Sequence, residues 1–182
     1  MVLGWIAATP WLLLLWITDE RVRWLRTYLF SNGGANRVLA PIRELDAVWQ
    51  AIERASLALG LVLSTLVINT ALMRNVSIEA GVAPASFSQW EVIGYGVFFM
   101  VILAAILIPV LIGWRDAGFD LVSLAVPDTA SGIPDEAGAA ARERLVVRIG
   151  IERSYVRHPI PILGVLSPFL TAFATSLIPT GS

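Results

Sequence analysis

Cysteine and lysine are both absent from this chain of 182 residues, and histidine occurs once. Without cysteine there can be no disulfide, thiolate metal site, thioether-linked haem or cysteine nucleophile. Without lysine there can be neither a Schiff base nor a phosphate-loop lysine. All 13 basic residues are therefore arginines, a bias that fits a GC-rich bacterial genome.

Charge of either sign is scarce as well. Charged residues make up 15% of the chain, hydrophobic residues make up 57%, and the formal net charge is -1. This hydrophobic fraction exceeds what a soluble core needs and predicts segments that lie in lipid. A net charge near zero provides no field to attract nucleic acid, so we expect no nucleic-acid partner.

The arginines are unevenly distributed along the chain. Twelve of the 13 lie in two stretches, from Arg21 to Arg54 and from Arg115 to Arg157, and only Arg74 lies outside them. Cytoplasmic loops of membrane proteins carry an excess of arginine and lysine. The pattern therefore predicts that both stretches are cytoplasmic and that the N-terminus lies outside the cell.

The predicted fold is an all-α integral membrane protein that forms a single membrane domain. Residues 55–73 and 92–114 are uncharged and long enough to cross a hydrocarbon core about 30 Å thick. The predicted order is a hydrophobic N-terminal segment (1–18), a cytoplasmic amphipathic region (19–54), a transmembrane helix (55–73), an external loop (74–91), a transmembrane helix (92–114), a cytoplasmic region (115–158) and a hydrophobic C-terminal segment (159–182). Four prolines predict that the last segment is broken. We expect a multi-pass protein of the cell membrane, specifically a bacterial inner membrane.

An amphipathic helix is predicted from Val38 to Ile52, because apolar residues recur there at spacings of three and four. Pro41 is compatible with this helix only in its first turn. No breaker separates it from residues 55–73, so one long helix is predicted. Its apolar face is a candidate docking surface, represented by Ile42, Leu45, Trp49 and Ile52.

Small and polar residues inside the hydrophobic segments are candidates for helix contacts or for a pore. The candidates are Gly60, Ser64, Asn69, Gly164, Ser167, Thr171 and Thr175. Such residues usually mark close helix packing, and a C-terminal stripe of this kind can also line a narrow pore made by several copies. Packing is favoured, because hydroxyls in lipid-facing helices also bond to their own backbone.

No arrangement of residues in the sequence indicates catalysis. Arg153 and His158 fit a nuclease spacing that chance produces often, and they are explained more simply as residues at the level of the lipid headgroups. Asp116 and Asp120 lie outside the hydrophobic segments, so no proton relay at bilayer depth is indicated. We therefore predict no catalytic residue, no cofactor and no metal site.

Three functions are compatible with these observations. The favoured one is a non-catalytic membrane subunit that oligomerises or docks onto other subunits of a membrane complex, with membrane lipids as its surroundings. The alternative is a pore-forming or membrane-permeabilising protein with the C-terminal stripe as its lining. An enzyme or transporter for a lipid or small solute would need a buried charge or a convergent polar cluster, which the sequence does not indicate.

Overall fold

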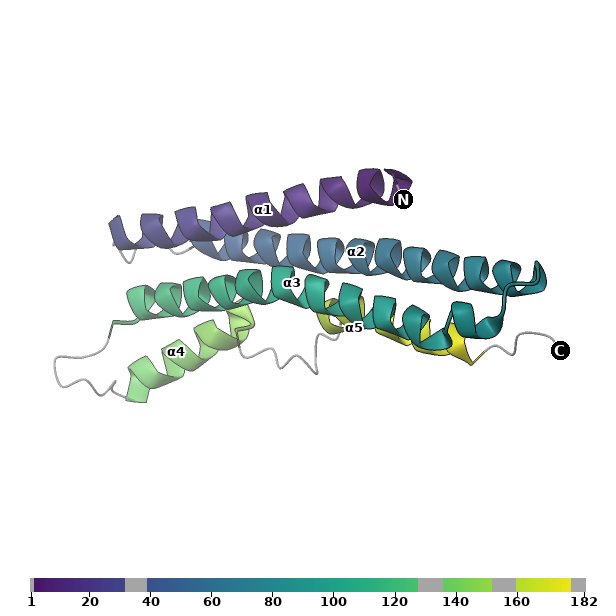
Figure 1. The fold of residues 1–182 in the computed structure, drawn as a ribbon. Helices are drawn as coiled ribbons and strands as arrows, with labels where there is room; N and C mark the ends of the chain where they lie inside the picture. The colour runs from purple at the N-terminus through teal and green to yellow at the C-terminus, as the bar shows by residue number, and fades with distance from the viewer. Residues whose placement is uncertain (1, 32–38, 128–135, 152–159, 178–182) are drawn as a thin grey trace. The chain divides into compact units, whose positions relative to one another are not determined.

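The computed structural model describes residues 2–31, 39–127, 136–151 and 160–177, and within them all regular structure is helical (Figure 1). The elements are α1 (Val2–Ser31), α2 (Leu39–Glu79), a short 3-10 helix η2 (Pro84–Ser86), α3 (Gln89–Ala125), α4 (Glu136–Ile149) and α5 (Ile160–Ser176). Two of them, Ala40–Glu79 and Gln89–Ala125, are long and apolar enough to cross a membrane, and Ile160–Ser176 is apolar but shorter. The all-helical prediction is confirmed.

The chain divides into two compact units, and the long helices contribute to both. Unit 1 comprises Met1–Leu13, Arg54–Leu107 and Ile160–Ser182, and unit 2 comprises Leu14–Glu53 and Ile108–Pro159. Apart from Arg54, the two arginine-rich stretches of the sequence fall within unit 2. The uncharged segments that were predicted to cross the membrane fall mostly within unit 1.

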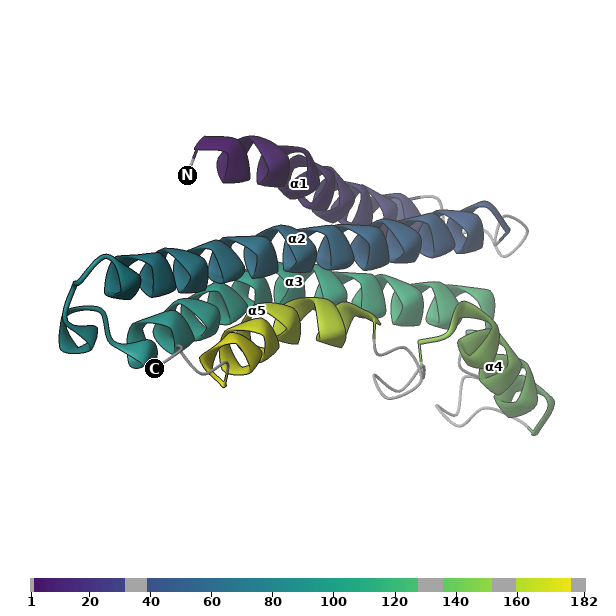
Figure 2. The same ribbon diagram turned by 90° about the vertical axis from the view of Figure 1, so that its right-hand side faces the viewer.

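Unit 1 is built on the second half of α2 and the first half of α3, with α5 running alongside them (Figure 2). Val67, Ala71, Val92 and Ala172 form a buried cluster, against which Phe99 packs. The lone Arg74 secures the connection between α2 and α3, because its Nε donates a hydrogen bond of 3.0 Å to the Phe87 carbonyl oxygen.

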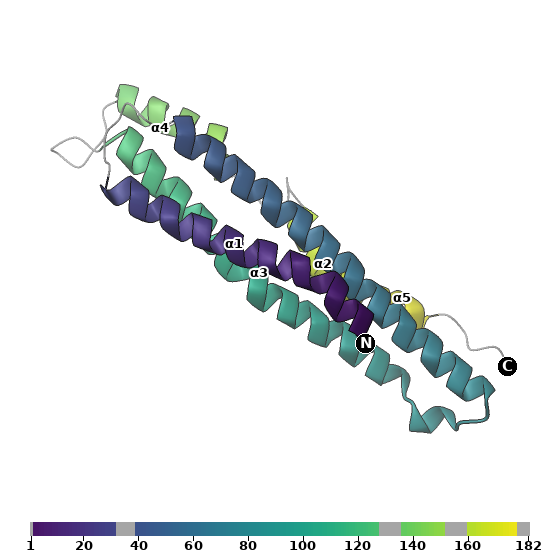
Figure 3. The same cartoon turned by 90° about the horizontal axis from the view of Figure 1, so that it is seen from above.

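Unit 2 packs the remaining part of α1, the start of α2 and the end of α3 around one another, and Figure 3 shows the ends of α1 and α3 side by side. Leu45 and Ile52 are fully buried, and the Trp49 and Trp114 rings lie 4.7 Å apart.

The helix α4 ends just before Gly150, whose φ of 78° is a left-handed conformation that glycine adopts without strain. The helix predicted over Val38–Ile52 is confirmed from Leu39, where α2 begins, and α2 continues as one helix to Glu79; Val38 lies outside the described residues.

Several predicted segment boundaries are not helix ends. α1 continues past residue 18 to Ser31, α2 past residue 73 to Glu79, and α3 past residue 114 to Ala125. Hydrophobicity falls at each of these points, but no cluster of glycine and proline follows to break the helix. The predicted break in the C-terminal segment is also wrong for residues 160–176, which form one helix with Pro161 in its first turn and Pro168 inside it.

Candidate functional site

In unit 1, α2 and α5 approach each other closely along a seam of small residues. A methyl group added to Gly60 would lie 2.5 Å from the Gly164 carbonyl oxygen and 2.6 Å from the Ser167 hydroxyl oxygen. One added to Gly164 would lie 2.6 Å from the Ser56 carbonyl oxygen. Backbone therefore lies against backbone, an approach that only residues without bulky side chains permit.

Pro168 adds a hydrogen-bonding requirement to this seam. Proline has no backbone N–H, so it cannot donate to the carbonyl oxygen four residues earlier, that of Gly164. The Ser167 hydroxyl donates to that oxygen instead, at 2.8 Å. The Ser167 side chain thus satisfies a carbonyl group that the proline leaves open at the point of closest contact.

α3 contributes a third small residue, Gly96. A methyl group there would lie 2.5 Å from the Ala172 Cβ atom and 2.9 Å from the Pro168 carbonyl oxygen. Neither Gly96 nor Ser56 was among the predicted contact residues. The signal for Ser56 was present, because Ser56, Gly60 and Ser64 recur every four residues and so share one helix face.

The other candidates of the C-terminal stripe, Thr171 and Thr175, are partly exposed. The Thr175 hydroxyl donates to the Thr171 and Ala172 carbonyl oxygens at 2.9 and 3.0 Å. On α2, Ser64 is buried, and its hydroxyl has no hydrogen-bond partner in the described residues. The Ser167 and Thr175 hydroxyls thus both bond to carbonyl groups of their own helix.

Asn69 lies on the opposite side of α2 from this seam. It follows Gly60 by nine residues, or roughly two and a half helical turns, and its side chain is exposed. The neighbouring Thr65 is also exposed, but its hydroxyl donates to the Leu61 carbonyl oxygen at 2.9 Å. The Asn69 carboxamide makes no hydrogen bond with any described residue. It is therefore an exposed polar group without a hydrogen-bond partner in the part of the chain that the structure describes.

The predicted docking face of α2 lies inside unit 2. Ile42 and Trp49 are 8% and 7% exposed, and Leu45 and Ile52 are 0% exposed. The indole Nε1 of Trp114 donates to the Leu45 carbonyl oxygen at 2.9 Å. These side chains form part of the chain's own core, which leaves their apolar face no free area for a partner.

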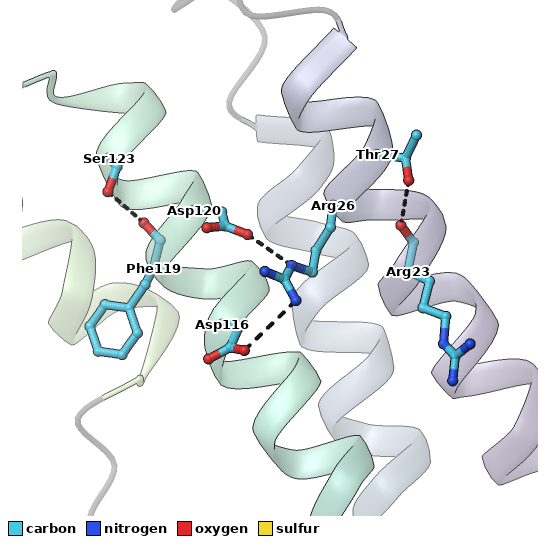
Figure 4. A network of polar contacts seen from close by, with 7 residues as sticks. All are labelled: Arg23, Arg26, Thr27, Asp116, Phe119, Asp120 and Ser123. Atoms are coloured by element: carbon cyan, nitrogen blue, oxygen red, sulfur yellow. Dashed lines mark hydrogen bonds and ion pairs between the residues drawn. The ribbon is translucent and has the colours of Figure 1, made fainter.

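Figure 4 shows a polar contact within unit 2 that the sequence analysis missed. Arg26 of α1 extends toward two carboxylates of α3, with its Nε 2.9 Å from Asp120 and a terminal nitrogen 3.7 Å from Asp116. Asp116 and Asp120 are four residues apart, so they share one face of α3. That spacing was a signal for a shared cationic partner, but the partner itself lies 94 residues from Asp120.

We expect Arg26→Ala to have a modest effect on stability, because the Arg26 side chain is 39% exposed and solvent screens the ion pairs. In a double-mutant cycle with Asp120→Ala, thermal unfolding in detergent should give a coupling free energy of about 0.2–1 kcal/mol. Arg23→Ala is the control, because Arg23 pairs only along α1 with Asp19 and its side chain is 73% exposed. A coupling free energy of zero would show that the Arg26–Asp120 pair does not stabilise the contact between α1 and α3.

Among the residues that the structure describes, no three His, Asp or Glu side chains lie close enough together to hold a metal ion. Arg153 and His158, whose spacing resembles a nuclease pattern, lie outside the described residues. Comparison with known proteins finds no matching family model, no similar curated protein and no similar solved structure.

Proposed function

We propose that this chain is a multi-pass membrane protein, with α2 and α3 as its spanning helices. One observation carries the proposal. In the most apolar 18-residue stretch of each helix, only 28% (α2) and 22% (α3) is buried within the chain. The core helix of a soluble protein would be mostly buried. The exposed side chains include Leu57, Leu61, Leu72 and Met73 on α2 and Phe98, Val101 and Ile102 on α3. Lipid would solvate this surface, whereas exposure to water would be costly.

The lengths of α2 and α3 support the same proposal. With 41 and 37 residues they extend over about 60 and 55 Å, roughly twice the thickness of a hydrocarbon core. Each helix must therefore project from a membrane. The charges fit this division, because residues 55–73 and 92–114 carry none, whereas α3 acquires Arg115, Asp116 and Asp120 immediately afterwards.

The orientation that we propose places unit 2 in the cytoplasm and the α2–α3 connection outside the cell. Apart from Arg54, both arginine-rich stretches belong to one compact unit, which supports their lying on the same side of the membrane. The excess of arginine in unit 2 favours the cytoplasmic side. The use of arginine in place of lysine fits a GC-rich bacterial genome. We therefore propose that the membrane is a bacterial inner membrane.

We further propose that the protein is a non-catalytic subunit that assembles with other copies or with other membrane proteins. The exposed Asn69 supports this role, because a polar group in lipid favours a helix partner. Asp116 and Asp120 of α3 pair with Arg26, and the Thr65 and Thr175 hydroxyls bond to carbonyl groups of their own helices. A pore has no comparable support, since Gly164 and Ser167 face α2 of the same chain.

Labelling of single cysteines tests the proposed topology, because the native chain contains no cysteine. We expect a cysteine at Ser86, in the α2–α3 connection, to react with an impermeant thiol reagent in intact cells. A cysteine at Gln50 should react only after the cells are opened. Both side chains are exposed in the structure, so burial does not explain a difference between them. The reverse pattern would refute the orientation, and release of the protein from membranes at alkaline pH would refute insertion.

A further inference from the structure

The exposed Asn69 poses a specific chemical problem if α2 crosses a membrane, as the proposed function requires. A carboxamide has two N–H donors and an acceptor oxygen. Lipid tails satisfy none of them, and an unsatisfied polar group in hydrocarbon is costly. Asn69 lies opposite Gly60, which faces α5, so α5 is out of its reach.

The residues around Asn69 have the spacing of a helix-pairing surface. Val62, Thr65, Asn69, Leu72 and Val76 follow one another at intervals of three, four, three and four residues, which places them on one stripe of α2. All of them are exposed except Val62, which is half-buried. A polar residue in the middle of such a stripe fixes the register of two paired helices.

We propose that α2 pairs with α2 of a second copy of this chain, and that the two Asn69 carboxamides hydrogen-bond to each other. Copies inserted in the same orientation are related by a two-fold axis perpendicular to the membrane, so their α2 helices run parallel. Asn69 then meets Asn69 at the same depth. A carboxamide is its own complement, because the N–H group of each copy can donate to the oxygen of the other.

The competing explanation is that Asn69 is hydrated at the lipid headgroups. It lies five residues, or about 7.5 Å along the helix, from Arg74, which we place near the outer boundary of the membrane. An asparagine side chain is short, and Leu72 and Met73, which lie between Asn69 and that boundary, are 55% and 69% exposed. The two explanations differ in what they predict for Asn69→Leu: pairing predicts weaker dimerisation, and hydration at the headgroups predicts no change.

The first test measures energy transfer between donor-labelled and acceptor-labelled full-length protein in liposomes over a range of protein-to-lipid ratios. We expect the wild type to dimerise and Asn69→Leu to weaken dimerisation roughly tenfold. Thr70→Val is the matched control, because the Thr70 hydroxyl bonds to the Leu66 carbonyl oxygen of its own helix. It should leave dimerisation unchanged. A monomeric wild type, or equal dimerisation of wild type and Asn69→Leu, would overturn the proposal.

The second test leaves Asn69 in place and uses disulfide formation in membranes. Cysteines at Thr65 or Leu72, on the stripe, should cross-link two copies on mild oxidation. A cysteine at Leu57 should not, because Leu57 is exposed but lies about 120° around the helix from Asn69. Cross-linking at Leu57 alone would overturn the proposed interface. Topology labelling of the same proteins separates the two failures: an inserted protein that does not pair through Asn69 contradicts only this inference.

Discussion

Gly96→Ala is expected to destabilise the protein, whereas Gly94→Ala, two residues earlier in the same helix, is expected to be neutral or stabilising. The added methyl group at Gly96 would lie 2.5 Å from the Ala172 Cβ atom, and that at Gly94 would meet nothing within 4 Å. Neither Ala172 nor the nearby Pro168 carbonyl group can move without its backbone. α5 would therefore have to shift, at a cost of about 1–3 kcal/mol.

The comparison is well matched because both substitutions replace glycine by alanine inside α3. Each gains up to about 1 kcal/mol of helix propensity, so the difference between them reports packing. Thermal unfolding in detergent measures this difference, at about 2–4 °C per kcal/mol for a chain of this size. Gly60→Ala should resemble Gly96→Ala, since the methyl group would lie 2.5 Å from the Gly164 carbonyl oxygen. Equal tolerance of all three changes would show that α5 does not pack here, which would again favour a pore-lining role for its polar stripe.

The second large effect is expected at Leu45. This side chain is 0% exposed, and the Trp114 indole donates to its carbonyl oxygen. Leu45→Glu would place a carboxylate at a fully buried position in an apolar core. We expect a loss of more than about 4 kcal/mol, or failure to fold.

Gln50→Glu is the control for Leu45→Glu, because it adds the same charge to an exposed position on the same helix. We expect its effect on stability to lie within about 0.5 kcal/mol. Limited proteolysis and thermal unfolding of the purified protein distinguish the two variants. If Leu45→Glu left the isolated protein stable but prevented its assembly, the apolar face of α2 would be a docking surface and not part of the core.

Much of the secondary structure follows from the sequence because it depends on local pattern. The three-four spacing around Leu45 and Trp49 predicts the helix and the face that it buries, and Gly150 marks the end of α4. The ends of the helices are harder to predict, because α1, α2 and α3 continue past residues 18, 73 and 114, where the hydrophobic segments end. At Trp114 the apolar run ends, yet α3 continues to Ala125, because a polar residue ends a membrane span without breaking a helix.

The sequence also identifies Gly60 and Gly164 as candidates for close packing, but it does not show that they meet each other. The same holds for Arg26, whose carboxylate partners could not be identified from its neighbours in the chain. Local composition determines whether a segment is helical, which of its faces is apolar and which stretches carry charge, because these properties depend on residues within a few turns. The partners of each face are decided only by the tertiary structure, since the contacts between Gly60 and Gly164 and between Arg26 and Asp120 join residues about a hundred positions apart. Such contacts require backbones to approach within a few ångströms, and that distance depends on how whole helices pack and not on any one local pattern.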